Sequence, residues 1–350
     1  MLSKTDIYEL VTSLHDNYEL SGVVFAKEKY NVMHEAGYGF SNRADELNNN
    51  VNTRFNIGNG GKIFTSIAIS QLVEKGYFTF HSLLKDCLHY TFPHFDENIT
   101  IHQLLTHTSG IPDYYDKDTL GDYEELWKDK PTYAFQQLKD FLPLFENGEM
   151  MHQPGERFYY NNAGYILLGL IIEEKTGIPF AQYVEENILD KCDMNDSGYF
   201  SMDQLPANTA IGYIDDEEKD SWRTNYFSLP IRGGADGGAY VTAPDMVKFW
   251  ECLFKNKLLS REYTKKILEP YIKITSKEHY GYGLRITKMY NTVFKYHIKG
   301  YAPGVSFQAS YYPKFHLKLI VTSNQKIGAL DVTNAIEDNL TKDISIFFTD

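Results

Sequence analysis

Strand signals occur at both ends of this chain, with helix signals between them, and this arrangement constrains the fold most strongly. Residues 21–26 and 32–38 flank a polar turn, and residues 305–312 and 315–323 flank a Pro-Lys turn. Both pairs have the composition of β-hairpins. Residues 62–220 show mostly helix and loop patterns. We therefore expect an α+β fold in which one antiparallel sheet is built from both ends of the chain.

Terminal helices are expected to flank this sheet. Ser3 is spaced to cap a first helix, and residues 332–347 repeat apolar side chains about every fourth position, as an amphipathic helix does. We expect residues 1–61 and 221–350 to form the sheet domain and residues 62–220 to form an inserted, mostly helical domain.

Composition excludes several classes of function. The chain has 47 acidic and 34 basic residues and a net charge of −13, which argues against nucleic-acid binding. It contains no apolar run long enough to span a membrane and begins without the apolar core of a signal peptide, so the chain as printed is expected to be cytoplasmic unless a leader has been removed. The acidic run 215–220 is expected to be a solvated loop.

Metal, cofactor and disulfide chemistry are not expected. The histidines lack ligand spacing, and no Gly-rich phosphate loop is present. The cysteines Cys87, Cys192 and Cys252 lie in apolar neighbourhoods and are expected to be buried free thiols.

Lys62 is an unusual residue at the start of the apolar helix predicted over 62–76. A cation is disfavoured at a helix N-terminus, and burial would lower its pKa far enough for it to act as a base near neutral pH. The alternative is a surface lysine whose apolar stem covers the helix. Asn59 lies one turn earlier, can face the same cavity and is expected to cap the helix.

Two other stretches carry candidate residues. Asn162 is expected to cap the helix predicted over 165–175, and the Tyr160 hydroxyl can point into a cleft, although a packing role is the simpler reading of a single tyrosine. Residues 297–304 are Gly-rich and lead into a late strand, so a ligand can approach that backbone closely. An ordinary loop-to-strand turn is the alternative there.

Five stretches resemble, in the same order, segments of the serine β-lactamases and penicillin-binding proteins. The resemblance is to the class C β-lactamase and DD-peptidase branch with its esterase relatives, in which a Ser-x-x-Lys segment carries the nucleophile. The stretches are 55–65, 99–112, 154–165, 237–245 and 280–284.

This resemblance implies a β-lactamase/transpeptidase-like fold and a set of roles. Lys62 and Tyr160 would share proton transfer, and Asn162 would hold the lysine and the substrate. Backbone N–H groups at the nucleophile and at an edge strand would form the oxyanion hole. The ligand would be a small acyl, peptide or β-lactam molecule, and no cofactor is implied.

Asn59 departs from the family pattern, because it occupies the position of the nucleophilic serine. An amide has no hydroxyl that Lys62 could activate. Three hypotheses follow: a hydrolase that acts on an amide, ester or β-lactam by another nucleophile or through water, a pseudoenzyme that binds a small acyl or peptide ligand, or a replacement of a native serine that traps a complex. Impaired catalysis is expected in the printed sequence.

The edge strand is the second departure. The Lys or His of the family's Lys/His-x-Gly segment, which binds the substrate carboxylate, falls on Ile298. His297 lies one place early, Lys299 takes the middle position and Gly300 takes the glycine position. A shift of one residue turns a side chain to the other face of a strand. His297, Lys299 and Gly300 are the candidate substrate-binding residues, and the sequence leaves open which of them faces the cavity.

Overall fold

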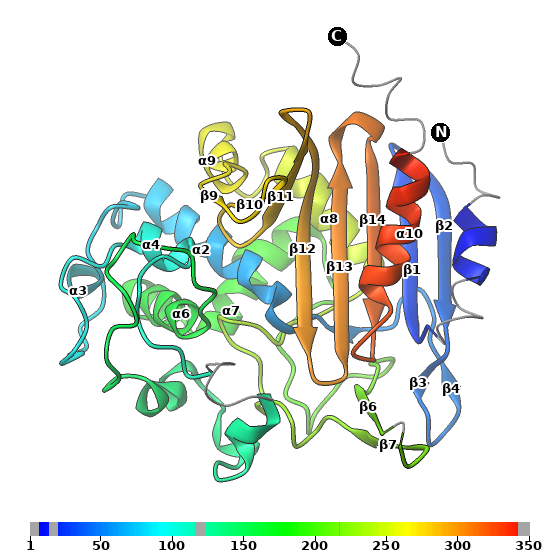
Figure 1. The fold of residues 1–350 in the computed structure, drawn as a ribbon, viewed down its shortest axis with the longest axis horizontal. Coiled ribbons are helices and arrows are strands. Elements are labelled where there is room, and N and C mark those ends of the chain that lie inside the picture. The colour runs from blue at the N-terminus through cyan, green and yellow to red at the C-terminus, as the bar shows by residue number, and fades with distance from the viewer. Residues whose placement is uncertain (1–6, 14–19, 116–122, 217, 342–350) are drawn as a thin grey trace.

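A computed structural model describes residues 7–13, 20–115, 123–216 and 218–341. Its centre is an antiparallel sheet of eight strands in the order β2-β1-β14-β13-β12-β11-β10-β9 (Figure 1). The strands are β1 Gly22–Glu28, β2 Asn31–Tyr38, β9 Ile272–Lys273, β10 Glu278–Tyr280, β11 Arg285–Met289, β12 Thr292–Ala302, β13 Val305–Tyr312 and β14 Leu317–Ser323.

The sheet is built from both ends of the chain, as predicted. The two predicted hairpins are β1-β2 and β13-β14, and they join because β1 pairs with β14, with Gly22 opposite Ser323. The sequence pattern did not assign β12, in which residues 297–302, expected to lead into a strand, are themselves strand residues. It also did not assign β9, β10 and β11, which are short and extend the sheet beyond β12.

The outer face of the sheet is covered by terminal helices, as predicted. Residues 7–13 are helical, and α10 spans Ala329–Thr341. Ile7 and Val11 join Val332 and Ile336 of α10 in a small apolar core on this face. The start of the first helix at Ser3 and the last part of the predicted tail helix lie outside the described residues.

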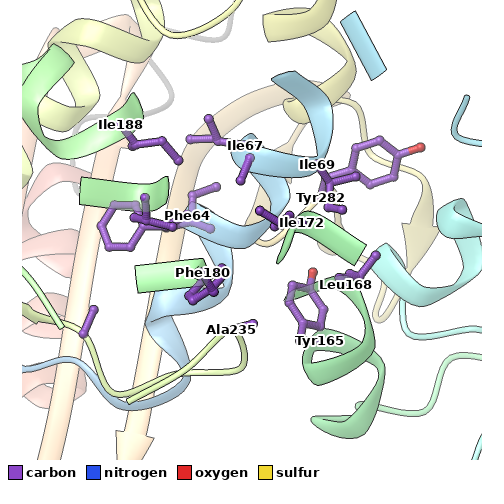
Figure 2. Close-up of a cluster of buried hydrophobic side chains, with 14 of the residues drawn as sticks. Phe64, Ile67, Ile69, Tyr165, Leu168, Ile172, Phe180, Ile188, Ala235 and Tyr282 are labelled. Atoms are coloured by element: carbon purple, nitrogen blue, oxygen red, sulfur yellow. The ribbon is translucent and has the colours of Figure 1, made fainter. Parts of the chain in front are cut away.

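The larger core lies on the opposite face, around the central helix α2, Lys62–Glu74. Every residue of α2 from Lys62 to Val73 is buried, which confirms a central helix that is apolar on most sides. Figure 2 shows Phe64, Ile67 and Ile69 of this helix among side chains of its neighbours. The other helices are α3 Leu84–Cys87, α4 Ile101–Leu105, α6 Ala163–Thr176, α7 Phe180–Val184, α8 Ala243–Phe254 and α9 Arg261–Ile267.

Most of these helices belong to the middle of the chain and lie to one side of the sheet (Figure 1). The helix α6 ends at Gly177, which has a φ of 71° as a left-handed C-terminal cap requires. The predicted architecture of a sheet flanked by terminal helices with a helical insertion is confirmed. The division at residues 61 and 221 stays a prediction.

The prediction of a solvated loop over residues 215–220 holds for residues 218–220, which form an exposed turn. Asp215 and Asp216 instead belong to β6, Tyr213–Asp216, which pairs with β7, Ser221–Thr224. Charge did not prevent strand pairing here because Asp215 forms an ion pair with Arg43, whose guanidinium lies 4.6 Å from the centre of the Tyr213 ring.

The remaining elements are short. Four segments of two or three residues complete the described strands in two pairs: β3 Phe40–Asn42 with β4 Leu47–Asn48, and β5 Phe55–Asn56 with β8 Tyr240–Val241. The three cysteines are buried free thiols, as predicted. Within the described ranges, no helix is both long enough and apolar enough to cross a membrane.

The strand β12 crosses the chain segment that leads into α2, and two glycines permit the close approach. A Cβ atom on Gly300 would lie 1.9 Å from the carbonyl oxygen of Ile57. Gly58 has a φ of +50°, and a Cβ atom there would lie 2.7 Å from the carbonyl oxygen of Tyr301. These contacts fix the end of β12 against the start of α2.

We predict that Gly300→Ala lowers the free energy of unfolding by about 2 kcal/mol or more, because β12 must move away from Ile57 to admit the methyl group. Urea denaturation measures the change. The matched control is Gly61→Ala, whose Cβ would lie 3.4 Å from Gly237, an ordinary contact. The control is expected to change the value by about 0.5 kcal/mol at most. Equal stability of the two variants would contradict the close approach.

Candidate active site

A cavity of about 1810 Å³ opens beside the segment that leads into α2. A single 3-10 turn, Gly58–Gly61, precedes the helix and brings Asn59 to the cavity wall. The wall also includes Tyr160, Asn162, Asp236 and Tyr301. Three of the four predicted catalytic residues therefore line one cavity, and the fourth, Lys62, lies directly behind them.

Lys62 is buried and tied to two oxygen atoms. Its Nζ donates to Asn162 Oδ1 and to the carbonyl oxygen of Asp236, each at 2.7 Å. Burial lowers the pKa of Lys62 to about 8, although the negative charges of Asp236 and Asp113 oppose the shift. The sequence-based expectation of a desolvated lysine at this helix start is confirmed, and the alternative of a surface lysine is wrong.

Asn162 orients Lys62 but does not cap α6. Its side chain makes no cap hydrogen bond, and the neighbouring Asn161 Oδ1 accepts from Gly164 N at 2.7 Å instead. Asp113 holds Asn162, because its Oδ2 accepts from the backbone N at 3.0 Å and from Nδ2 at 3.1 Å. These bonds leave Asn162 Oδ1 pointing toward Lys62.

Asp113 was not predicted from the sequence. Besides Asn162, it accepts from the backbone N of Ala163 and of Tyr114, each at 2.9 Å. Burial raises the pKa of Asp113 to about 6, while these hydrogen bonds and the nearby Lys62 charge favour the carboxylate. Its position directly after the 99–112 stretch was the available signal.

Tyr160 packs against a buried histidine. The ring centres of Tyr160 and His107 are 4.3 Å apart, and Lys62 Nζ lies 5.0 Å from the centre of the Tyr160 ring. Burial raises the pKa of Tyr160 well above its usual value, so the hydroxyl keeps its proton. Tyr160 is therefore suited to donate a proton or a hydrogen bond, and not to act as a free phenolate.

His107 supports this arrangement and was also missed. Its Nδ1 accepts from Asn161 N at 3.1 Å, so the proton resides on Nε2, which lies 2.9 Å from the Tyr280 hydroxyl. Burial lowers the pKa of His107 well below its usual value, and the positive Lys62 adds to the effect. The imidazole is thus neutral and fixed, with both nitrogens bonded to the protein.

Asn59 does not cap α2, so that part of the prediction is wrong. The helix begins after Gly61, which makes no side-chain cap, and Asn59 lies within the preceding 3-10 turn. Its Oδ1 instead accepts from the backbone N of Tyr301 at 3.1 Å. The amide oxygen of Asn59 therefore accepts the hydrogen bond of a backbone N–H group at the end of β12.

The register of β12 separates the three edge-strand candidates. Ile298 belongs to the larger core. Its Cγ2 atom is 3.4 Å from where a Cβ atom of Gly60 would lie, so Ile298 faces the start of α2. His297 and Lys299 lie on the opposite face of the strand, because successive side chains alternate. Neither lines the cavity, and Lys299 Nζ lies 3.2 Å from a Glu278 carboxylate oxygen. A role for His297, Lys299 and Gly300 in binding substrate stays a prediction.

Comparison with known proteins agrees with this geometry. The family described as Beta-lactamase matches residues 8–338. The chain belongs to the β-lactamase family. A penicillin-binding protein of Bacillus halodurans has the same fold, with a TM-score of 0.90 and 48% identity over 94% of this chain and 99% of its own. A penicillin-binding protein homologue from Pyrococcus abyssi has a TM-score of 0.79 and 26% identity over 93% of this chain and 74% of its own.

The curated relatives of this β-lactamase-family chain are longer. Two proteins of Bacillus subtilis, a penicillin-binding protein and the putative penicillin-binding protein PbpX, are 25% and 28% identical over 78% and 87% of this chain. The match spans 61% and 70% of their own lengths. Protein flp of Staphylococcus aureus is 31% identical over 51% of this chain and 34% of its own length. The two structural matches confirm the β-lactamase/transpeptidase-like fold.

We predict that the free energy of unfolding of the wild type rises relative to Lys62→Met as the pH rises from about 7 to about 10. Above the folded pKa of about 8, the unfolded chain still binds a proton at Lys62 and the folded chain does not, so folding gains stability with pH. The expected gain is about 2 kcal/mol. Urea denaturation of both proteins at each pH measures this gain. The contributions of the other titrating groups cancel in the difference between the two free energies of unfolding. A difference that stays constant would contradict a neutralised, buried Lys62.

Proposed function

We propose that this chain binds a small acyl-bearing ligand in the cavity and forms no covalent acyl intermediate. The hydrogen bond from Tyr301 N to Asn59 Oδ1 carries the proposal. Tyr301 N is on the edge strand that the family resemblance assigns to the oxyanion hole, and here it donates to the protein itself. The amide of Asn59 has no ionisable hydroxyl, so Lys62 has nothing to activate at this position.

The retained groups support a ligand site. Lys62, Asn162 and Tyr160 lie close together, and the family resemblance assigns them proton transfer and substrate contact. A large cavity gives access to Asn162 and Tyr160. A β-lactam is a reasonable probe, since the 48% identical relative is described as a penicillin-binding protein. The ligand of this chain is proposed as an amide, ester or β-lactam that binds non-covalently.

An active hydrolase with another nucleophile is the second candidate, and the lowered pKa of Lys62 favours it. The neighbouring hydroxyls argue against it. Ser66 is fully buried with its Oγ 3.2 Å from the Tyr165 hydroxyl, and Ser109 is buried as well. Among the described cavity-lining residues, the serines are Ser21 and Ser221, and Ser21 Oγ is engaged by Asn324 at 2.7 Å. The non-covalent proposal therefore fits the site better.

We predict that a fluorescent penicillin leaves no labelled band after denaturing electrophoresis of the printed chain, because Asn59 cannot be acylated. The matched control is Asn59→Ala, which also lacks a hydroxyl and is expected to give the same blank result. A labelled band that disappears in Asn59→Ala would contradict the proposal. A band present in both proteins would identify a different nucleophile.

We predict that Asn59→Ser gains hydrolysis of a short-chain p-nitrophenyl ester by about a hundredfold or more. The serine would supply a hydroxyl beside Lys62 and release Tyr301 N. Release of p-nitrophenolate measures the rate, and a chromogenic cephalosporin serves as a second substrate.

The pH profile of this gain tests the role of Lys62. The rate of Asn59→Ser should fall about tenfold per pH unit below about 8 and level off above it, because only neutral Lys62 accepts the serine proton. The double variant Asn59→Ser, Lys62→Met is the control and should lose the gain. A folded Asn59→Ser protein without any gain would show that the remaining groups do not form a working site.

A further inference from the structure

We infer that Asp236 selects the ligand by charge, so that the cavity favours an acyl ligand with an ammonium group over one with a carboxylate. The inference rests on the proposed function, because it concerns the ligand of the same cavity. Nothing in the sequence had singled out Asp236.

Asp236 lies at the cavity wall, beside the proposed reaction centre. Its carbonyl oxygen accepts from Lys62 Nζ at 2.7 Å, which fixes the backbone next to the lysine. Its half-buried carboxylate lines the cavity. One carboxylate oxygen, Oδ2, accepts from the Tyr114 hydroxyl, and the other, Oδ1, has no hydrogen-bond partner among the described residues. Oδ1 is therefore available to a ligand.

The charges around Lys62 do not balance. Lys62 is one cation, whereas Asp113 and Asp236 both act on it as anions. Asp113 is fully engaged, since four N–H groups donate to its two oxygens. Lys62, Asp113 and Asp236 together therefore carry an excess negative charge. Asp236 is the carboxylate that still has a free oxygen. An ammonium group on a ligand would neutralise this excess, whereas a carboxylate would add to it.

A buried hydroxyl near Gly61 also lacks a partner. Tyr199 is 2% exposed and its hydroxyl makes no hydrogen bond within the described ranges. The charge of Asp236 contributes, after burial, to raising the pKa of Tyr199, and the Tyr199 hydroxyl lies 3.6 Å from where a Cβ atom of Gly61 would be. Tyr199 does not line the cavity, so its hydroxyl is an unsatisfied buried group near the site and not a contact for a ligand there.

The opposite charge preference has little support at this site. Ile298 faces the start of α2 at the position where the family has a cation for the substrate carboxylate, and Lys299 is paired with Glu278 on the other face. The described cavity wall carries seven acidic and three basic residues. Of the basic ones, Arg43 is paired with Asp215, and Arg232 and Lys326 are exposed, where salt screens their charge.

Three probes that share one benzene ring and differ in charge test the inference: benzylamine, benzamide and benzoate. We expect the printed chain to bind benzylamine at least about tenfold more tightly than benzoate at pH 7.5, as measured by NMR titration. Asp236→Asn should remove the preference for benzylamine over benzamide, because the amide keeps an acceptor for Tyr114 without the charge. The matched control is Asp216→Asn, which removes one cavity-wall carboxylate that already pairs with Lys219. This control should keep the preference.

The opposite results would overturn the inference. Benzoate binding as tight as benzylamine binding, or a benzylamine preference that survives in a folded Asp236→Asn protein, would show that Asp236 does not select by charge. Absence of binding by all three probes would also reject it. Failure of the proposed function gives a different signal, since it appears as a covalent penicillin adduct that depends on Asn59.

Discussion

The buried ammonium of Lys62 is the interaction on which the site depends. Its hydrogen bonds reach Asn162 at the start of α6 and the carbonyl oxygen of Asp236 in the loop before β8, while its own backbone begins α2. Three segments from distant parts of the chain therefore converge on one nitrogen atom. A buried amine that lacked these acceptors would be costly, so the contacts stabilise the fold and the arrangement of the site together.

A side-chain contact at residue 59 ties the start of α2 to the end of β12. The amide Oδ1 of Asn59 accepts from the backbone N of Tyr301, a hydrogen bond within the protein. Asp113 accepts a hydrogen bond from Asn162, and the His107 ring packs against Tyr160. The positions of the supporting groups therefore do not depend on a nucleophile at residue 59.

Much of the fold and part of the candidate site could be predicted from the sequence, for reasons that differ between residues. The hairpins and the buried helix α2 follow from local patterns, and the position of Lys62 follows from its contrast with an apolar neighbourhood. The failures involve groups whose partners are distant in sequence. Asn59 and Asn162 have good cap propensity, but their hydrogen bonds go to Tyr301 and Asp113 instead. Local sequence also cannot show that a carboxylate such as Asp236 keeps one free oxygen.

The joining of the sheet has a consequence for synthesis on the ribosome. The central pairing of β1 with β14 places Gly22 opposite Ser323. β1 therefore cannot form this pairing until β14, which is synthesised about 300 residues later, has been made. Until then β1 has an open edge, and open edges pair readily with other chains. Contacts this distant along the chain slow folding, whereas the helices between them can form from local contacts. The N-terminal hairpin is therefore the part of this protein most in need of protection while the chain is being made.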